Sequence, residues 1–246
     1  MNNFKLKSLA QIVNSNHLAA AVFEKYHLDF CCKGKRSLQQ ACIEQELPAD
    51  QIVTELENIS IANLQADALP FDEMTLAQLA EYIVLTHHDY VKKELPLIHG
   101  YLQKVFSKHG ERHPEMFKVF QLFAAVKEEL EGHMKKEELI LFPRIKEMEK
   151  QLQNEPGQFK LNIGYLQSPI TVMEQEHDHA GTLLNEIRIL TNNYTPPQDA
   201  CTTYKLSFAA LQAFELDLHR HVHLENNILF QKAISSFKDL NEIVLN

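Results

Sequence analysis

A histidine–carboxylate frame that occurs twice constrains this chain more than any other feature of its sequence. Glu137 follows His133 by four residues, Glu225 follows His221 by four, and an Ile-Leu-Phe run begins seven residues after each histidine. Residues four apart share one face of a helix, so each pair can offer an imidazole nitrogen and a carboxylate oxygen to one metal ion. A single His-x3-Glu is more often a surface pair. Two copies in the same frame predict a metal site.

The composition favours an all-α protein. Only 7 of the 246 residues are glycine, 45% are hydrophobic, and long stretches rich in Leu, Ala, Glu, Gln and Lys show helical periodicity. The net charge of −9 argues against non-specific binding to nucleic acid or to an anionic membrane. No apolar run reaches the ~20 residues that span a bilayer, and no signal-peptide core is visible. We therefore expect a cytoplasmic protein whose cysteines are reduced.

Breaks in the helical pattern divide the chain into two predicted domains. Residues 1–60 predict a small bundle of short helices, residues 61–73 a linker, and residues 74–246 a larger domain of four long helices. Short connections between long helices are typical of an antiparallel four-helix bundle. Helix starts in the small domain are expected at Asn16, Ser37 and Pro48.

The four long helices can be placed approximately from their periodicity and punctuation. They are expected at residues 75–108, 116–151, 169–192 and from Asp199 or Thr202 onward. Pro96 is expected to bend the first of them. Residues 152–168, which contain Pro156, Gly157 and Gly164, predict an irregular connection.

Each half of the predicted bundle repeats one arrangement of histidines and carboxylates. A histidine on the first helix of each half precedes the His-x3-Glu pair of the next helix, at a spacing that agrees to within one residue. Two antiparallel pairs of this kind can bring four histidines and two carboxylates together, which suits two metal ions with bridging carboxylates. The six predicted ligands are His88, His133, Glu137, His177, His221 and Glu225.

The ligand types narrow the choice of metal but do not settle it. Mixed imidazole and carboxylate ligands suit iron, manganese or zinc, and spacing alone does not choose among them. The duplicated, carboxylate-bridged arrangement makes two iron ions with an oxo or hydroxo bridge the preferred interpretation. Ferritin-like bundles use Glu-x-x-His on two helices, and here His177, with Glu174, is the only predicted ligand histidine in that frame. A histidine-rich, hemerythrin-like centre is therefore favoured.

The remaining histidines lack this frame. Those next to a predicted ligand lie one or two positions away from it and should point in other directions. These are His87, His179, His219 and His223, while His99, His109 and His113 lie at or beyond the end of the first long helix.

Two acids and one apolar run lie close to the predicted ligands. Glu129 is one turn before His133 and Glu176 precedes His177, so both are candidate acids beside the metal, although solvated glutamates would look the same. Core positions are expected at Leu139, Leu141 and Phe142.

The strings around these ligands resemble the repair of iron centres (RIC) family over nearly the full length of the chain. The matching strings are residues 133–138, 141–143, 176–181, 191–203 and 221–230. The resemblance implies a hemerythrin-like antiparallel four-helix bundle, preceded by a small helical ScdA-type domain. It also implies a di-iron centre held by the six residues that the repeat predicts.

Two adjacent cysteines resemble the family's N-terminal domain. Asp29-Phe30-Cys31-Cys32 is followed by Gly34 and by the cations Lys33, Lys35 and Arg36. Adjacent cysteines are commonly buried small hydrophobes, but we expect the neighbouring cations to favour the thiolate form. Iron handling, thiol redox chemistry and contact with a damaged client are the roles considered for Cys31 and Cys32.

The resemblance implies repair of iron–sulfur clusters damaged by oxidative and nitrosative stress, with damaged iron–sulfur proteins and nitric oxide as partners. Iron donation is the preferred mechanism, because a bridging carboxylate can change its binding mode as one iron leaves. The alternatives are an enzyme that reduces nitric oxide at the di-iron centre and a hemerythrin-like sensor or store of oxygen or nitric oxide. The paired cysteines disfavour an oxygen carrier. A homodimer is one assembly that the sequence leaves open.

Overall fold

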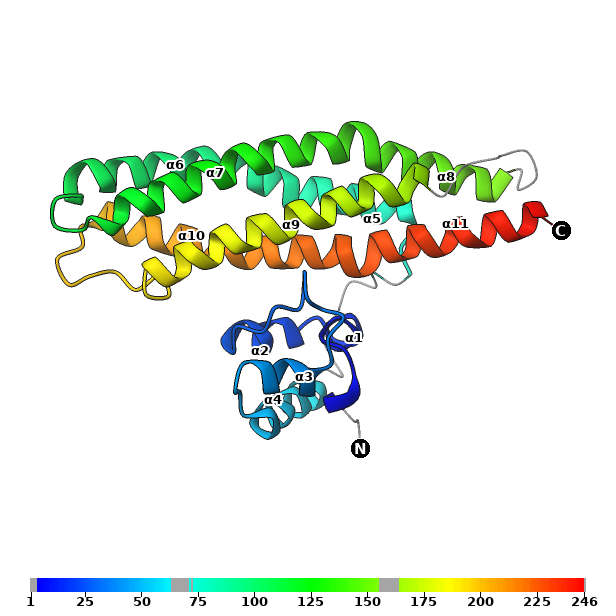
Figure 1. Cartoon of the computed structure of the whole chain (residues 1–246), viewed down its shortest axis with the longest axis horizontal. Helices are drawn as coiled ribbons and strands as arrows, with labels where there is room; N and C mark the ends of the chain where they lie inside the picture. Colours follow the sequence, from blue (N-terminus) through cyan, green and yellow to red (C-terminus); the bar gives the residue numbers. More distant parts are fainter. Residues whose placement is uncertain (1–3, 63–70, 72, 155–163, 246) are drawn as a thin grey trace. The chain divides into compact units, whose positions relative to one another are not determined.

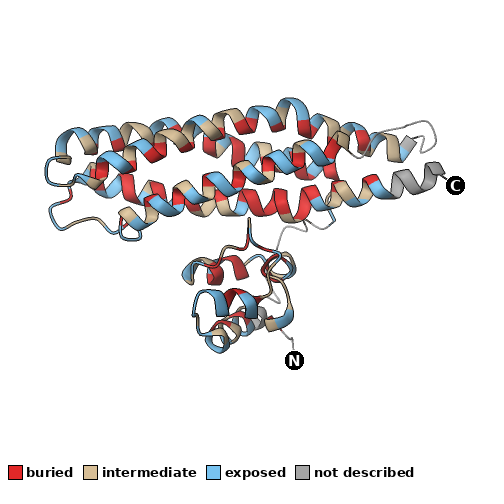
Figure 2. Cartoon of the chain, viewed as in Figure 1, coloured by how far each residue is buried: buried red, intermediate tan, exposed pale blue. Residues whose placement is uncertain are grey.

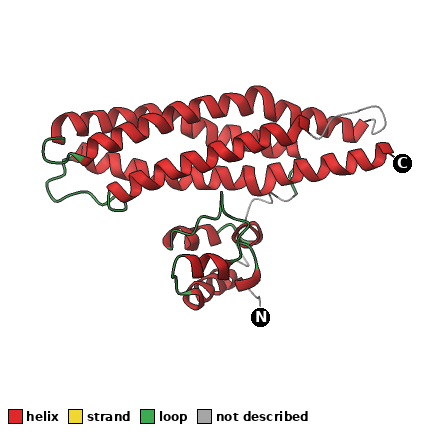
Figure 3. Ribbon diagram, viewed as in Figure 1, coloured by secondary structure: helices red, strands yellow, loops and turns green. Residues whose placement is uncertain are grey.

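The computed structural model describes residues 4–62, 71, 73–154 and 164–245 (Figure 1). Within these ranges the regular secondary structure is helical (Figure 3), and a single isolated β-bridge joins Ser8 to Ser37. The all-α prediction is therefore confirmed. The chain forms two compact units, one of Met1–Thr75 with His219–Lys232 and one of Leu76–Leu218 with Ala233–Asn246. None of the described helices combines the length and apolar character that crossing a bilayer requires.

Four helices form the N-terminal part of the first unit. They are α1 (Leu9–Ser15), α2 (Ala19–Lys25), α3 (Leu38–Glu44) and α4 (Ala49–Ala62), preceded by the 3₁₀ turn η1 (Phe4–Leu6). Ser8 and Ser37 cap α1 and α3 by accepting a hydrogen bond from the backbone of Gln11 and Gln40. The predicted cap at Asn16 was wrong. Asn16 ends α1, and its side chain accepts from Leu18, the residue before α2.

Aromatic side chains make the core of these short helices. Phe23 and Phe30 are at most 1% exposed, and their ring centroids lie 6.1 Å apart. The turn after Phe30 needs a glycine, because a Cβ at Gly34 would lie 2.2 Å from the Phe30 carbonyl oxygen. The cysteine segment is therefore held by a tight turn against an aromatic core.

Residues 219–232 belong to the first unit through side-chain hydrogen bonds from one face of their helix. His219 bonds to Glu24 at 2.7 Å and His223 to Asn14 at 2.9 Å. Asn227 donates to the Cys31 carbonyl oxygen at 2.9 Å. Burial lowers the pKa of His223 to about 4, so this imidazole is neutral near pH 7.

The remaining elements form four continuous helical runs (Figure 1). The first two runs are α5 (Leu76–Ile83), η2 (Val84–His88) and α6 (Asp89–His109), then α7 (Glu115–Lys136), η3 (Glu137–Leu141) and α8 (Phe142–Asn154). The third is α9 (Gly164–Leu190), and the fourth joins α10 (Thr202–Leu224), η4 (Glu225–Leu229) and α11 (Phe230–Leu245). The first two runs are antiparallel, because α6 packs on α7 and α5 packs on α8.

The predicted connection at residues 152–168 was too long. Helix α8 continues to Asn154 and α9 already begins at Gly164, whereas residues 155–163 lie outside the described part. Pro169, expected to open the third helix, lies inside it and cannot donate to the Tyr165 carbonyl. Arg144 donates to that carbonyl at 3.0 Å instead, so a neighbouring helix satisfies the acceptor.

The long runs are interrupted by π turns, which the sequence did not predict. Pro96 lies inside α6, and the change of helix type in that run falls at Val84–His88. Two more π turns are Glu137–Leu141 and Glu225–Leu229. A π turn inside an α-helix is rare and is frequently found at functional sites.

Buried residues, red in Figure 2, alternate with exposed ones along each helix. Phe123 on α7 and Phe214 on α10 are both fully buried, and their rings meet edge to face with centroids 5.6 Å apart. Aromatic pairs of this geometry add about 0.5–1.5 kcal/mol to the free energy gained from burial alone. The bundle thus has a continuous apolar core in which buried polar groups need an explanation.

Candidate metal centre

Every π turn of the described helices begins or ends at a predicted ligand. The turn η2 ends at His88, η3 begins at Glu137, and η4 begins at Glu225. The two His-x3-Glu frames keep α-helical spacing, because each carboxylate stands where its π turn starts. The wider turn then changes which residues beyond the carboxylate face the interior.

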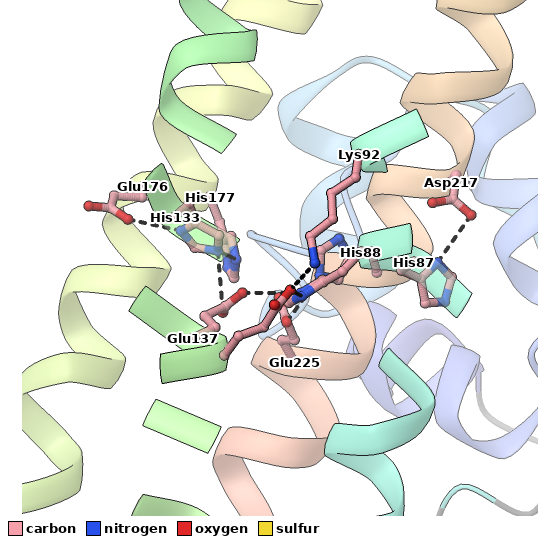
Figure 4. A network of polar contacts seen from close by, with 11 residues as sticks. His87, His88, Lys92, His133, Glu137, Glu176, His177, Asp217 and Glu225 are labelled. Atoms are coloured by element: carbon pink, nitrogen blue, oxygen red, sulfur yellow. Dashed lines mark hydrogen bonds and ion pairs between the residues drawn. The ribbon is translucent and has the colours of Figure 1, made fainter. Parts of the chain in front are cut away.

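The structure brings the six predicted ligands together in two overlapping groups, and Figure 4 labels all of them except His221. In each group the donor atoms all lie within 4.8 Å of one another. The first group is His88, Glu137, His221 and Glu225, and the second is His133, Glu137, His177 and Glu225. Both carboxylates belong to both groups, and all six residues are at most 2% exposed.

Glu137 has one carboxylate oxygen directed to each of two histidines. Its Oε2 lies 3.3 Å from Nε2 of His88, and its Oε1 lies 3.2 Å from Nε2 of His133. A carboxylate that offers one oxygen to each of two sites is suited to bridging two metal ions.

The second frame shows the same pairing of histidine with carboxylate. Nε2 of His221 lies 3.0 Å from Oε1 of Glu225. Nε2 of His133 and Nε2 of His177 lie only 2.9 Å apart. Two imidazole nitrogens this close need a proton or a cation between them, and fully buried carboxylates also need a positive partner. The donor set and its burial therefore fit bound divalent metal ions.

Two of these histidines each form a hydrogen bond through Nδ1 to a carboxylate that also binds a lysine. Glu138 Oε1 accepts from Nδ1 of His88 at 2.7 Å and from Nζ of Lys92 at 2.6 Å. Burial acts to raise the pKa of the Glu138 carboxyl, but the hydrogen bonds from Lys92 and His88 outweigh it and lower that pKa. This carboxylate is therefore ionised near pH 7 and fixes the tautomer of His88 with the proton on Nδ1, so that Nε2 carries the lone pair that can bind a metal ion.

His133 has the corresponding arrangement. Its Nδ1 lies 2.9 Å from Oε2 of Glu176, and Lys136 donates to Oε1 of the same carboxylate. The hydrogen bonds from Lys136 and His133 again outweigh burial and lower the pKa of the Glu176 carboxyl. Glu176, one of the two acids that the sequence singled out, thus contacts a predicted ligand.

The sequence did not identify Glu138, and it singled out Glu129, which bonds elsewhere. Glu129 pairs with His179 at 2.8 Å, and both side chains are more than one-third exposed. The available signal for Glu138 was its position directly after Glu137, together with Lys92 four residues after His88. Recognising it required knowing that Glu138 on η3 reaches His88 on η2 and Lys92 on α6.

The other histidines lie outside the two donor groups. His87 bonds to Asp217 at 3.1 Å and is 5% exposed, so it points away from the ligands but not into solvent. At the end of α6, His109 lies 3.2 Å from the Cys201 sulfur, and His113 lies 3.0 Å from an Asp199 oxygen. The last two contacts join the turn after α6 to the loop before α10.

The apolar run after Glu137 is only partly core. Leu141 and Phe142 are at most 2% exposed, and the Phe142 ring stacks on His88 with centroids 5.7 Å apart. Leu139 is 75% exposed, so its predicted core position was wrong. It lies two residues beyond the inward-facing Glu137 and therefore points to the opposite side of the helix.

A third group of metal-capable atoms lies in the first unit and consists of Asp29, Cys31 and Cys32. The Cys31 sulfur lies 3.3 Å from an Asp29 oxygen and 3.9 Å from the Cys32 sulfur. The hydrogen bond with Cys32, together with burial and the nearby carboxylate, raises the pKa of the Cys31 thiol well above its ordinary value. The predicted preference for thiolate was therefore wrong at Cys31. Arg36, one of the cations expected to produce it, is paired with Glu44.

Sequence comparison places both parts of the chain in known families. The profile of the hemerythrin HHE cation binding domain matches residues 79–233. A second profile, ScdA_N, described as a domain of unknown function, matches residues 5–60. The match to the hemerythrin profile covers all six predicted ligands.

Curated relatives align over nearly the entire chain. The iron-sulfur cluster repair protein YtfE of Enterobacter sp. (strain 638) is 35% identical over 232 residues, which cover 94% of this chain and 98% of that protein. YtfE of Escherichia coli O81 (strain ED1a) has the same identity and coverage. With a hemerythrin HHE bundle, an ScdA-type segment before it and full-length similarity to YtfE, the chain belongs to the repair of iron centres family.

Proposed function

We propose that this protein holds two iron ions and supplies iron to iron–sulfur clusters damaged by oxidative and nitrosative stress. The observation that carries the proposal is the pair of overlapping donor groups that share Glu137 and Glu225. The proposed ligands are His88, His133, Glu137, His177, His221 and Glu225. Imidazole with carboxylate is a donor set that suits iron, and the hemerythrin match and the named activity of the YtfE relatives favour iron over manganese or zinc.

The two shared carboxylates are the residues that would permit release. A carboxylate that serves two metal sites can remain bound to one ion when the other leaves, so loss of one iron need not leave a buried charge without a partner. Bound iron would supply the ion that a damaged cluster has lost. The protein's own task is to hold that ion among buried ligands and to keep their protons and orientations fixed until transfer.

The proposed partners and compartment follow from this task. We propose damaged iron–sulfur proteins as clients and nitric oxide as a further ligand, in the cytoplasm, where the four free cysteines would stay reduced. We propose the domain limits 1–60 and 74–246, with residues 61–73 as a linker that lies mostly outside the described residues. In this division we assign contact with a client to the ScdA-type domain, which carries Cys31 and Cys32.

Transfer of labelled iron tests the proposal. Protein loaded anaerobically with isotopically labelled iron is mixed with aconitase damaged by nitric oxide, and aconitase activity, label in aconitase and nitrous oxide are followed together. We expect activity and label to appear in aconitase in parallel. A double variant, Glu137→Ala with Glu225→Ala, should bind little iron and restore little activity.

The alternative function gives a different result in the same experiment. Nitrous oxide formed over many turnovers without aconitase, with no label transferred, would replace iron donation by nitric oxide reduction at the same residues. Reactivation with label transfer and without nitrous oxide would support donation.

A further inference from the structure

Two groups of three side chains in the second unit share one design. In each, a histidine and a lysine about one turn apart on the same helical run bind a glutamate from another run: His88, Lys92 and Glu138 form one triad, and His133, Lys136 and Glu176 form the other. Both glutamates are partly buried, with 26% and 29% of the side chain exposed, and the lysines are about half exposed. The repetition on different helices indicates a common purpose.

The carboxylate and the lysine have opposite effects on the strength of the histidine as a metal ligand. A carboxylate bonded to Nδ1 draws that proton towards itself, raises electron density on the ring and strengthens Nε2 as a metal ligand. An ammonium bound to the same carboxylate neutralises part of its charge and weakens this effect. Each lysine should therefore make its histidine a poorer ligand than a histidine–carboxylate pair alone.

The two triads differ in one detail that ranks them. Nδ1 of His88 and Nζ of Lys92 bind the same oxygen of Glu138, at 2.7 Å and 2.6 Å. In the other triad, His133 binds one oxygen of Glu176 and Lys136 binds the other. Competition for a single oxygen is more direct than competition across a carboxylate. The effect of Lys92 should accordingly exceed that of Lys136.

We propose that Lys92 and Lys136 are positioning residues that keep the metal centre labile by weakening His88 and His133 as iron ligands through Glu138 and Glu176. This inference rests on the proposed iron site and deepens it, because it assigns the release property to residues outside the ligand set. The competing explanation is that each lysine only joins two helices by an ion pair. Partly exposed pairs of that kind contribute little to stability.

Opposite effects of the lysine and glutamate substitutions separate the two explanations. If the triad only joins helices, Lys92→Met and Glu138→Gln break the same ion pair and should change iron retention in the same direction. If Lys92 weakens His88 through Glu138, Lys92→Met should slow iron loss and Glu138→Gln should accelerate it. Lys92→Arg keeps the charge and should resemble the parent protein.

The experiment measures the rate at which full-length, iron-loaded protein loses ferrous iron to an excess of a chelator under anaerobic conditions. We expect loss to be about fivefold slower in Lys92→Met, less slowed in Lys136→Met, and about 10–100-fold faster in Glu138→Gln. The control is Lys127→Met, which breaks a 2.7 Å ion pair with Glu131 within α7, in which no predicted ligand takes part. Its rate should equal that of the parent.

A second measurement detects charge rather than packing. Removing Lys92 takes a positive charge from the surroundings of the metal, so the midpoint potential of the iron should fall in Lys92→Met and stay unchanged in Lys127→Met. Faster iron loss in both Lys92→Met and Glu138→Gln, or a Lys92→Met rate equal to the parent's, would overturn the inference. Iron retained in the expected order but never transferred to aconitase would overturn donation and leave this inference standing.

Discussion

The two halves of the bundle sequence carry the same ligands but differ in what lies next to them. Glu137 is followed by Glu138, which binds His88, whereas Glu225 is followed by Asn226. The repeat therefore preserves the donors that a metal ion requires and changes the residue beside them.

The positions before the two single histidines differ in the same way. His177 is preceded by Glu176, which binds His133, whereas His88 is preceded by His87, which binds Asp217. Both histidines of the first half are thus held by a lysine-bound carboxylate. Metal binding constrains the type and spacing of the ligand residues in both halves. The charged residues around the ligands are not constrained in this way, and they can change how strongly the ion is bound. Four predictions test this comparison, in order of decreasing effect.

Removing either shared carboxylate should have the largest effect, and the two should be alike. Glu137→Ala and Glu225→Ala should each reduce iron affinity by about a hundredfold or more, because each residue contributes to both donor groups. Iron per chain after gel filtration measures the loss, with the exposed Glu147→Ala as control. A large loss in one variant alone would show that the halves are not equivalent in binding.

The phenylalanines at the end of the two Ile-Leu-Phe runs should matter next. Phe142 and Phe230 are both at most 2% exposed, so Phe142→Ala and Phe230→Ala should each lower the free energy of unfolding by about 3–5 kcal/mol. Denaturant unfolding of iron-free protein measures this, with the 46% exposed Phe117→Ala as control. Phe142 also stacks on His88, so its removal should additionally weaken iron binding. Equal iron binding by the two variants would contradict that role.

A comparison of Glu176→Gln with His87→Gln tests the residues that precede His177 and His88. The first substitution removes the charge behind His133 and should lower iron affinity by about 10–100-fold. The second acts on a side chain bonded to Asp217 and should lower affinity less. Iron titration of the two proteins decides the order, and an equal loss would mean that this difference between the halves has no effect on binding.

The smallest effect is expected from breaking the hydrogen bond between His113 and Asp199, which joins the two halves. The hydrogen bond from His113 lowers the pKa of the Asp199 carboxyl in the folded protein. A lowered folded pKa contributes stability above the unfolded pKa, about 4, and this contribution is lost as pH falls through the folded value. Asp199→Asn should slightly lower the unfolding temperature at about pH 6 and have a smaller effect at about pH 3. A larger effect at the lower pH would contradict this sign.

Much of the fold could be read from the sequence because its signals are local. The Ser37 cap, the start of α10 at Thr202 and the helical periodicity depend on residues within one or two turns. The errors arose where a distant group intervened. Pro169 is accommodated inside α9 because Arg144 donates to the carbonyl to which proline, having no N–H, cannot donate. The Cys31 thiol stays protonated because Cys32, burial and Asp29 raise its pKa despite the nearby cations.

The sequence by itself determined which six side chains come together, because the i to i+4 spacing and its duplication are properties of single helices and of the repeat. Only the tertiary structure decided which residues form hydrogen bonds to those side chains. Glu138 reaches His88, and Glu176 reaches His133, across a helix interface. Glu138 lies in the π turn that begins at Glu137, and no local pattern in the sequence predicted that turn. The predicted ligands can therefore be identified from the sequence, whereas the strength with which they would hold a metal depends on contacts between helices.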